Sequence, residues 1–198
     1  MKDLYQKILS QVTSSGQMFE TRDVVNESGV TFREYINFPD SIRGYLDFLL
    51  LHSDKECIVF EDERYSYEEV FKKSAQTGNA LIQEGIVKGD KVAICMQNNP
   101  EFIFAYLGIV GIGAVCVPLN SWWVPSEVIY GLEHSDAKLI FADKKRMQGL
   151  ESLKNVKKIV TTYTPDKQFR LFSDFIDNQP TTFPEVNIDR DDHATIYY

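Results

Sequence analysis

The segment from Lys88 to Asn120 constrains the fold of this chain most strongly, because it has the pattern of one complete βαβ unit. Its first strand, expected at Lys91–Met96, is apolar from Val92 onward apart from one weakly polar cysteine, so both of its faces are expected to be buried. Strands that are hydrophobic on both faces and joined by a helix are typical of parallel sheets. We therefore expect an α/β fold with a mainly parallel sheet flanked by helices.

The helix of this unit is expected at Pro100–Val110. It is apolar nearly all round, which predicts burial rather than a face toward solvent. Asn99 is a suitable N-cap, and the proline that follows suits the first helical position. Gly111 and Gly113 end the helix, and a second buried strand is expected at Ala114–Val117.

Between Glu101 and Glu127 no residue is charged, and this length is enough for a membrane-spanning helix. Three glycines and two prolines interrupt the stretch, however, and no Lys or Arg flanks either end. A helix, a turn and a strand explain it better, so we expect no transmembrane segment.

The remaining elements follow from the spacing of apolar residues. Helices are expected at Ile42–His52 (with Leu46, Leu49 and Leu50 on one face), at Tyr67–Glu84, from Pro125 through Leu132 and around Arg146–Leu150, and strands at Cys57–Glu61, Arg64–Ser66, Lys138–Ala142, Lys157–Thr161 and Ala194–Tyr198. Ser66 and Glu69 form a capping box at the start of the second helix. Its buried stripe is expected to be Val70, Phe71, Ser74, Gly78, Leu81 and Ile82.

Two segments contain little regular pattern. Residues 1–39 have a short amphipathic start followed by irregular polar sequence, and Asp174–Asp192 is expected to be a polar linker. We accordingly expect a leader with its helix in residues 1–56 and one α/β subdomain in residues 57–198, a length that buries a sizeable core.

Composition narrows the function classes. With 43% hydrophobic and 25% charged residues the chain is globular rather than disordered. A net charge of −8 argues against general affinity for nucleic acid or an anionic membrane. The N-terminus lacks the apolar core of a secretory signal, so a cytoplasmic location is expected. The three cysteines form no CxxC pair, and Cys95 and Cys116 are expected to be small core residues, whereas Cys57 has no such assignment.

Candidate sites must be compared with plain structural roles. Gly108, Gly111 and Gly113 resemble a dinucleotide-binding glycine loop, but that loop follows a strand and begins a helix, whereas these glycines end one. Close packing of helix on sheet is the better explanation. His52, His134 and His193 are dispersed, so no metal site is expected.

Three further groups of residues each have a possible functional role and a plain structural one. His134, Ser135 and Asp136 are adjacent and cannot point at one another as a catalytic triad, so a helix C-cap is expected. Asp191-Asp192 is expected to be a solvated turn rather than a cation site. Trp122-Trp123 fits either the wall of an apolar pocket or packing between helix and sheet, with packing favoured.

Several short motifs occur in a fixed order along the chain. They are YSYEE at Tyr65–Glu69, KGDKVAI at Lys88–Ile94, NNPEF at Asn98–Phe102, GAVCVPLN at Gly113–Asn120 with SWW after it, HSDAK at His134–Lys138 and DDHATIYY at Asp191–Tyr198. Together they resemble the N-terminal part of AMP-forming acyl-CoA synthetases, which are adenylate-forming ligases. Residues 16–39 are similar to the leader of the fatty-acyl branch.

This resemblance implies an enzyme that joins a carboxylic acid to AMP, with ATP and Mg²⁺, and then transfers the acyl group to coenzyme A. In that family a Ser/Thr/Gly-rich phosphate loop with a lysine directly follows Ile-Tyr-Tyr, and this sequence stops at Tyr198. No catalytic, cofactor-binding or metal-binding residue of the family can therefore be assigned here, and the acid-binding residues are unknown. The chain is expected to be an inactive N-terminal fragment that binds no cofactor.

Two other classes remain open from the sequence. One is a non-catalytic interaction module or truncated pseudoenzyme, and the other is a complete small nucleotide-binding α/β protein unrelated to the ligases. For the fragment itself we expect a homo-oligomer, because Ala194–Tyr198 would present an unpaired strand edge.

Overall fold

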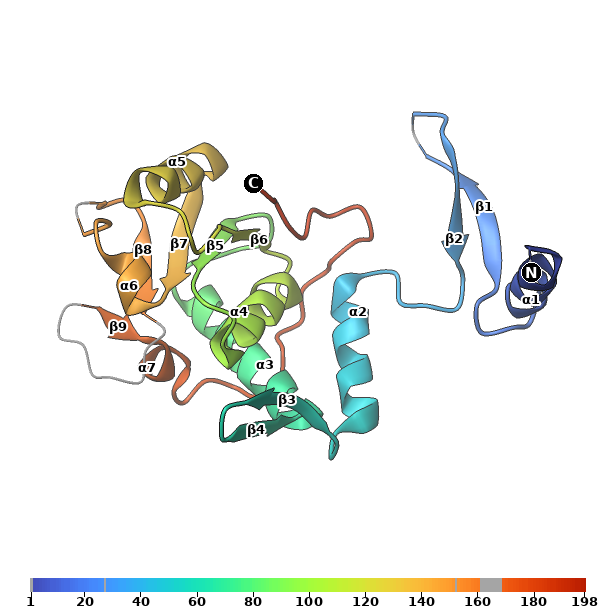
Figure 1. Ribbon diagram of the computed structural model, residues 1–198, viewed down its shortest axis with the longest axis horizontal. Coiled ribbons are helices and arrows are strands. Elements are labelled where there is room, and N and C mark those ends of the chain that lie inside the picture. Colours follow the sequence, from blue (N-terminus) through green and yellow to red (C-terminus); the bar gives the residue numbers. More distant parts are fainter. Residues whose placement is uncertain (1, 27, 152, 161–168) are drawn as a thin grey trace. The chain divides into compact units, whose positions relative to one another are not determined.

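The computed structural model describes residues 2–26, 28–151, 153–160 and 169–198 (Figure 1). The chain divides into two compact units, Met1–Asp40 and Ser41–Tyr198. Across the described ranges, no helix combines the length and apolar character required to cross a bilayer.

The first unit consists of helix α1 (Lys2–Val12) and an antiparallel hairpin of strands β1 (Thr21–Val25) and β2 (Thr31–Tyr35). The helix is the amphipathic start that the sequence predicted, but the hairpin falls where irregular structure was expected. Its strands carry two cross-strand ion pairs, Arg22–Glu34 at 2.6 Å and Arg33–Asp23 at 2.9 Å. None of the residues that the structure describes in this unit is buried.

The second unit is built on a five-stranded parallel sheet, which confirms the predicted fold class. Its strands, in the spatial order β6-β5-β7-β8-β9, are β5 (Lys91–Cys95), β6 (Val115–Pro118), β7 (Ala137–Ala142), β8 (Lys157–Val160) and β9 (Arg170–Leu171). Thr161, the expected end of the fourth strand, lies outside the described residues. The short strand β9 was not predicted.

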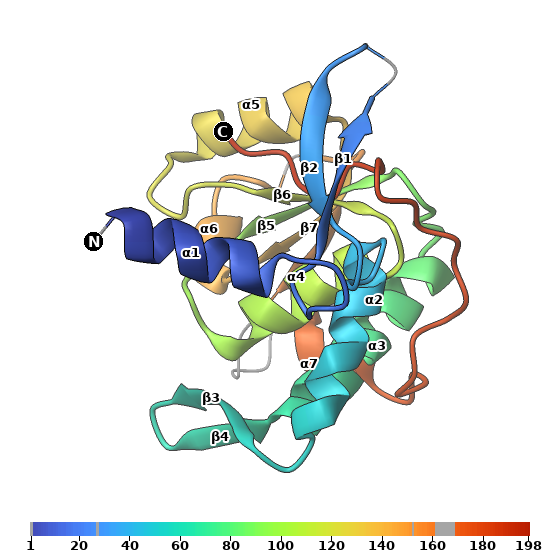
Figure 2. The same ribbon diagram turned by 90° about the vertical axis from the view of Figure 1, so that its right-hand side faces the viewer.

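Helices cover both faces of this sheet (Figure 2). Helices α3 (Tyr67–Gln83), α4 (Pro100–Gly111) and α7 (Phe172–Ile176) lie on one face, and α5 (Pro125–Ser135) and α6 (Lys144–Met147) on the other. Helix α2 (Ile42–Asp47), the 3₁₀ helix η1 (Phe48–His52) and the hairpin of β3 (Glu56–Phe60) and β4 (Glu63–Ser66) complete the unit. The predicted capping box of Ser66 and Glu69 is present at the start of α3.

Strand β5 is buried on both faces, as its composition predicted. Val92 and Ile94 join the core beneath α3 and α4, whereas Ala93 and Cys95 join the core beneath α5 and α6. Because successive side chains of a strand point to opposite faces, one apolar strand supplies both cores.

The glycines of α4 permit close packing, as predicted, although the main partner of Gly108 is a helix rather than the sheet. A Cβ atom at Gly108 would lie 2.7 Å from Thr77 Cβ and 2.8 Å from the Ser74 carbonyl oxygen, both in α3. A Cβ atom at Gly111 would overlap the ring of Phe183. These glycines therefore let α4 approach its neighbours and form no nucleotide loop.

Three burial predictions are wrong. Ile103 is exposed, so α4 has an exposed strip rather than burial all round. Ile82, near the end of α3, is 40% exposed. Leu50 is exposed because the helix expected at Ile42–His52 changes from α to 3₁₀ geometry at Phe48, which turns this side chain away from Leu46.

The tail also differs from expectation. Within Asp174–Asp192, where a polar linker was expected, Phe175 and Phe183 are buried in the core. These parts of the segment therefore pack against the α/β unit. The strand expected at Ala194–Tyr198 is reduced to one parallel bridge between Thr195 and Cys116 of β6. Cys116 N donates to the Ala194 carbonyl and Ile196 N donates to the Cys116 carbonyl, both at 2.9 Å.

Candidate functional site

The strand order points to one edge of the sheet. Strand β5 lies between β6 and β7. The chain passes from β5 to β6 on one side and then crosses to β7 on the other side, so the direction of winding reverses beside β5. Open parallel sheets bind ligands at the carboxyl ends of their strands where this reversal occurs. The loops that follow β5, β6 and β7 therefore form the candidate site, which we call the carboxyl edge.

A polar cluster joins these three loops. The Asp143 carboxylate, directly after β7, accepts hydrogen bonds from Gln97 N at 3.1 Å and from Arg146 Nη1 at 2.9 Å. Arg146 Nε donates to the carbonyl of Ser121 at 2.9 Å. Asp143 also caps helix α6 by accepting from the backbone N–H of Arg146. The Arg146 and Asp143 side chains are only 9% and 16% exposed, so this ion pair is nearly buried.

The loop after β6 presents the tryptophan pair in two different ways. Asn120 Oδ1 accepts from Trp122 N at 2.9 Å, and Trp123 N donates to the Asn120 carbonyl at 3.0 Å. Trp123 is partly buried and packs against the core beneath α5, as expected. Trp122 is 87% exposed, so the packing predicted for it is wrong, whereas its place in the wall of an apolar pocket stays a prediction.

The residues at the end of α5 form no catalytic triad, as predicted. His134 Nδ1 lies 2.8 Å from the Tyr198 hydroxyl, and its ring stacks on Tyr130 with 5.4 Å between centroids. Ser135 is buried and donates to the Gly131 carbonyl instead. Asp136 is the C-cap in the left-handed conformation, with φ of 57°.

Asp191 and Asp192 lie in a turn, as expected, and Asp192 also forms an ion pair there. Its carboxylate lies 2.6 Å from Lys88 Nζ, and Asp189 lies 3.4 Å from the same amine. The hydrogen bond from Lys88 lowers the pKa of Asp192. Asp191 and His193 are exposed beside it. Over the described ranges, no three His, Cys, Asp or Glu side chains are grouped so as to hold a metal ion.

The two strand cysteines are buried, as predicted. Burial raises the pKa of the Cys95 thiol to about 11 and that of Cys116 still further. Both are therefore neutral thiols at physiological pH, which suits a core residue and not a nucleophile.

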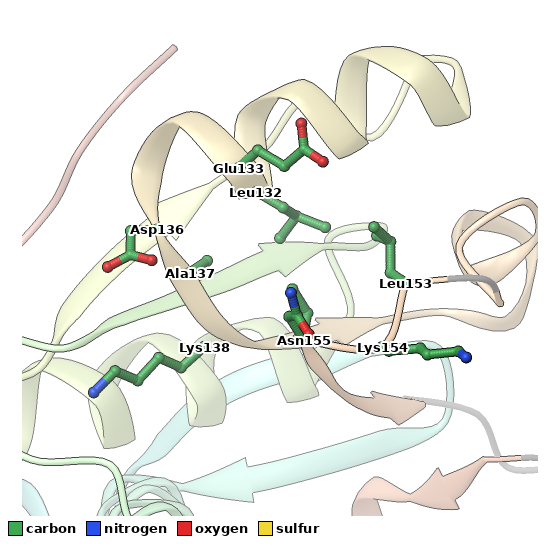
Figure 3. A pocket seen from close by; sticks show the side chains of 9 residues that line it. Leu132, Glu133, Asp136, Ala137, Lys138, Leu153, Lys154 and Asn155 are labelled. Carbon is green, nitrogen blue, oxygen red and sulfur yellow. The ribbon is translucent and has the colours of Figure 1, made fainter.

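A hollow of about 580 Å³ lies at the opposite, amino edge, lined by the end of α5, the start of β7 and residues 153–156 (Figure 3). Glu133 and Asp136 contribute carboxylates, and the amine of Lys138 pairs with Asp90 at 2.6 Å. The carboxyl end of a helix carries partial negative charge, which disfavours phosphate. The carboxyl edge therefore remains the better candidate for a ligand that carries phosphate.

Residues 50–198 match the family model described as AMP-binding enzyme. The chain belongs to this family. The match overturns the alternative of an unrelated small nucleotide-binding protein. Among curated AMP-binding enzymes, 4-coumarate–CoA ligase 3 of Arabidopsis thaliana is 33% identical over 149 residues, and 3-hydroxybenzoate–CoA/4-hydroxybenzoate–CoA ligase of Thauera aromatica is 30% identical over 151. Each alignment covers 73% of this chain, but only 27% and 29% of those enzymes.

Solved structures give the same picture. Coronafacic acid ligase from Pectobacterium brasiliense aligns with a TM-score of 0.72 and 28% identity, over 79% of this chain and 33% of that one. The anthranilate CoA ligase AuaEII, in complex with anthranoyl-AMP, shares the fold with a TM-score of 0.75 at 24% identity, over 80% of this chain and 32% of that one. The chain thus spans about a third of the length of these AMP-binding enzymes.

Among the described residues, the nearly buried polar groups of the carboxyl edge leave no free charge for the ATP that AMP-forming ligases use. Arg146 is nearly buried and donates to Asp143 and Ser121, and Asp143 is occupied by Arg146 and Gln97. These groups do not fit a triphosphate or its metal ion, because their charges already pair with each other. Neither Asp143 nor Arg146 was identified from the sequence as a site residue. The available signal was an acidic residue directly after a buried strand and at a helix start.

Proposed function

We propose that this chain is the N-terminal part of an AMP-forming acid–CoA ligase, which activates a carboxylic acid as an acyl-adenylate and transfers it to coenzyme A. The match of residues 50–198 to the AMP-binding enzyme family carries this proposal. The two curated relatives described above are named as CoA ligases, which favours coenzyme A as the acceptor.

The 198 residues alone are proposed to be inactive and to bind neither ATP, Mg²⁺ nor coenzyme A. Adenylation depends on positioned charge around the phosphates. At the carboxyl edge the buried guanidinium and carboxylate are already paired, which supports this view. In the resembled ligases the phosphate loop follows the Ile-Tyr-Tyr motif, here Ile196–Tyr198.

For the acid, we propose an aliphatic, fatty carboxylic acid. The support is the similarity of residues 16–39 to the leader of the fatty-acyl branch. The exposed Trp122 adds nothing to it. Aryl acids are the alternative, because relatives named for coumarate and hydroxybenzoate match this chain.

We also propose that the ligase is cytoplasmic, that it has no nucleic-acid partner and that the 198-residue chain self-associates. Exposed aromatic residues at the chain end, with Tyr197 among them, support association. The division into a leader with its helix (residues 1–56) and an α/β subdomain (residues 57–198) stays a prediction.

The test is to express the whole reading frame that contains these residues and to supply ATP, coenzyme A and one acid at a time. A suitable panel is 4-coumarate, 4-hydroxybenzoate, 4-hydroxybutyrate and octanoate. We expect acid-dependent AMP and pyrophosphate, with the acyl-CoA formed fastest from octanoate. Acid-dependent ADP, or no acid-dependent turnover, would contradict the ligase. A reading frame that stops at Tyr198 would favour the non-catalytic module instead.

A further inference from the structure

The ion pair at the carboxyl edge differs from the pairs at the amino edge. Arg146 is 9% exposed, whereas Lys138, whose pair with Asp90 has a comparable length, is 51% exposed. Lys88 and Lys157 pair at the same open edge. A largely desolvated charge is costly unless its hydrogen bonds are satisfied, so the retention of one buried pair needs a reason.

The chemistry of this pair supplies that reason. The planar guanidinium donates through two nitrogens in a fixed fork, one to Ser121 after β6 and the other to Asp143 after β7. The carboxylate oxygen of Asp143 that accepts from Arg146 Nη1 also accepts from Gln97 N, after β5. The pair is therefore a clamp across three loops, and a point charge such as lysine lacks the same fork.

The clamp holds the loop Asn120–Trp123, which carries the exposed side chain of Trp122. The backbone of Asn120–Trp123 is held by the Arg146 bond to Ser121 and by two hydrogen bonds to Asn120. On this fixed backbone stands Trp122, which is almost fully exposed at the edge where parallel sheets bind ligands.

We propose that Arg146 and Asp143 are positioning residues of the ligase reaction, which fix the Asn120–Trp123 loop at the carboxyl edge for the reactants. They touch no phosphate themselves and act through the loop. This inference rests on the proposed function.

The kinetic test uses the ligase from the whole reading frame, with Arg146→Met, Arg146→Lys and Asp143→Asn. In Arg146→Met the carboxylate keeps its two backbone donors, which offset part of the cost of losing its charged partner. Because misplacement of a positioned group by about 1 Å costs up to about 100-fold, kcat/KM should fall by about 10- to 100-fold. Arg146→Lys should recover part of the loss, and Asp143→Asn should resemble Arg146→Met. Lys138→Met, which breaks a pair of the amino edge, is the matched control and should change kcat/KM by less than about twofold by the same reasoning.

Equal kcat/KM in Arg146→Met and the wild type, or an equal loss in Lys138→Met, would overturn the proposal. A ligase assay that fails for the wild type refutes the proposed function, and hydrogen exchange on the 198-residue chain then decides the clamp. The protection factors of the Gln97 and Trp122 amides should fall about tenfold in Arg146→Met and stay unchanged in Lys138→Met. Unchanged protection in Arg146→Met would refute the clamp itself.

Discussion

The hairpin β1–β2 and the unit β5–α4–β6 each contain two strands, yet only the second buries its side chains. In the hairpin, each face carries one cross-strand ion pair, Arg22–Glu34 on one and Arg33–Asp23 on the other. In the βαβ unit, both strands lie between two helical layers. The first arrangement suits a ribbon wetted on both faces, and the second can exist only inside a folded core.

The two regions therefore differ strongly in how much each side chain contributes to the free energy of unfolding. Full burial of one Val, Leu, Ile or Phe side chain contributes about 1.5–3 kcal/mol, whereas an exposed ion pair contributes about 0–1 kcal/mol. Substitutions in the sheet core should therefore have large effects, and those in the hairpin small ones.

The largest effect is expected for Phe175→Ala in helix α7. This ring is fully buried, lies 5.5 Å from the ring of Phe141 and has Arg170 above it at 5.0 Å. Its loss should cost about 3–5 kcal/mol of unfolding free energy, measured by urea denaturation. Phe169→Ala, a partly buried ring that packs against the core on the other face of the sheet, is the control with a smaller loss. A loss below about 1 kcal/mol would place α7 outside the core.

The next effect tests the contact between α3 and α4. Gly108→Val would force a side chain against Thr77 and the Ser74 carbonyl, so the helices must separate. We expect a loss of about 3 kcal/mol from overpacking, read from the urea midpoint. Ile82→Val, on the exposed side of α3, should change stability by less than about 0.5 kcal/mol. Similar midpoints for the two variants would show that the helices do not depend on this glycine.

The contrast between the two regions also explains what the sequence could predict. Strand β5 and helix α4 were predictable because their residues are apolar on more than one face, and only a central position in a layered fold tolerates that. The hairpin was missed because TRDVV and TFREY place charged residues on both faces, which hides the alternation typical of a half-buried strand. Their pairing depends on Arg and Glu side chains that meet only across the turn.

Contacts between residues far apart in the chain could not be predicted from the local pattern of apolar and polar residues. Phe175 and Phe183 occur singly among polar residues, and nothing local indicates that they reach core residues far away in the sequence, Phe141 and Phe71. The clamp of Asp143 and Arg146 was missed for the same reason, since Ser121 and Gln97 join it only through the topology of the sheet. The exposure of Trp122 could not be predicted, because it depends on the conformation of the loop after β6.

A smaller effect is expected at Glu84, at the end of α3. Lys157 and Arg170 donate to its carboxylate at 2.7 and 2.8 Å, and the bond from Lys157 lowers its pKa. Because the folded pKa is below the unfolded one, this stabilisation is present above the unfolded value, near about 4.3, and is lost as the pH falls through the folded value.

Glu84→Gln should therefore cost about 0.5–1 kcal/mol at pH 7 and progressively less below about pH 4. Urea denaturation of both proteins at pH 7 and in acid measures this. A difference between them that grows in acid would contradict the assigned sign.

The smallest effect belongs to the hairpin. Arg22 is 61% exposed and pairs with Glu34, so Arg22→Gln should change the unfolding free energy by at most about 0.5 kcal/mol. The measurement is the urea midpoint at low and high salt, with Lys72→Gln on α3, at a side chain that is 45% exposed, as the comparison. A loss above about 1 kcal/mol would mean that the hairpin contributes as a core element does.

The central proposal is that these 198 residues, which have the fold of the AMP-binding enzyme family, lack the phosphate chemistry of a ligase. Carboxylate-dependent exchange between ATP and pyrophosphate tests it most directly, when measured side by side on the purified 198-residue chain and on the protein of the whole reading frame. The account predicts exchange for the longer protein and none above background for the 198-residue chain. Exchange by the 198-residue chain at a rate comparable to that of the longer protein would contradict it and would place the catalytic groups within residues 1–198.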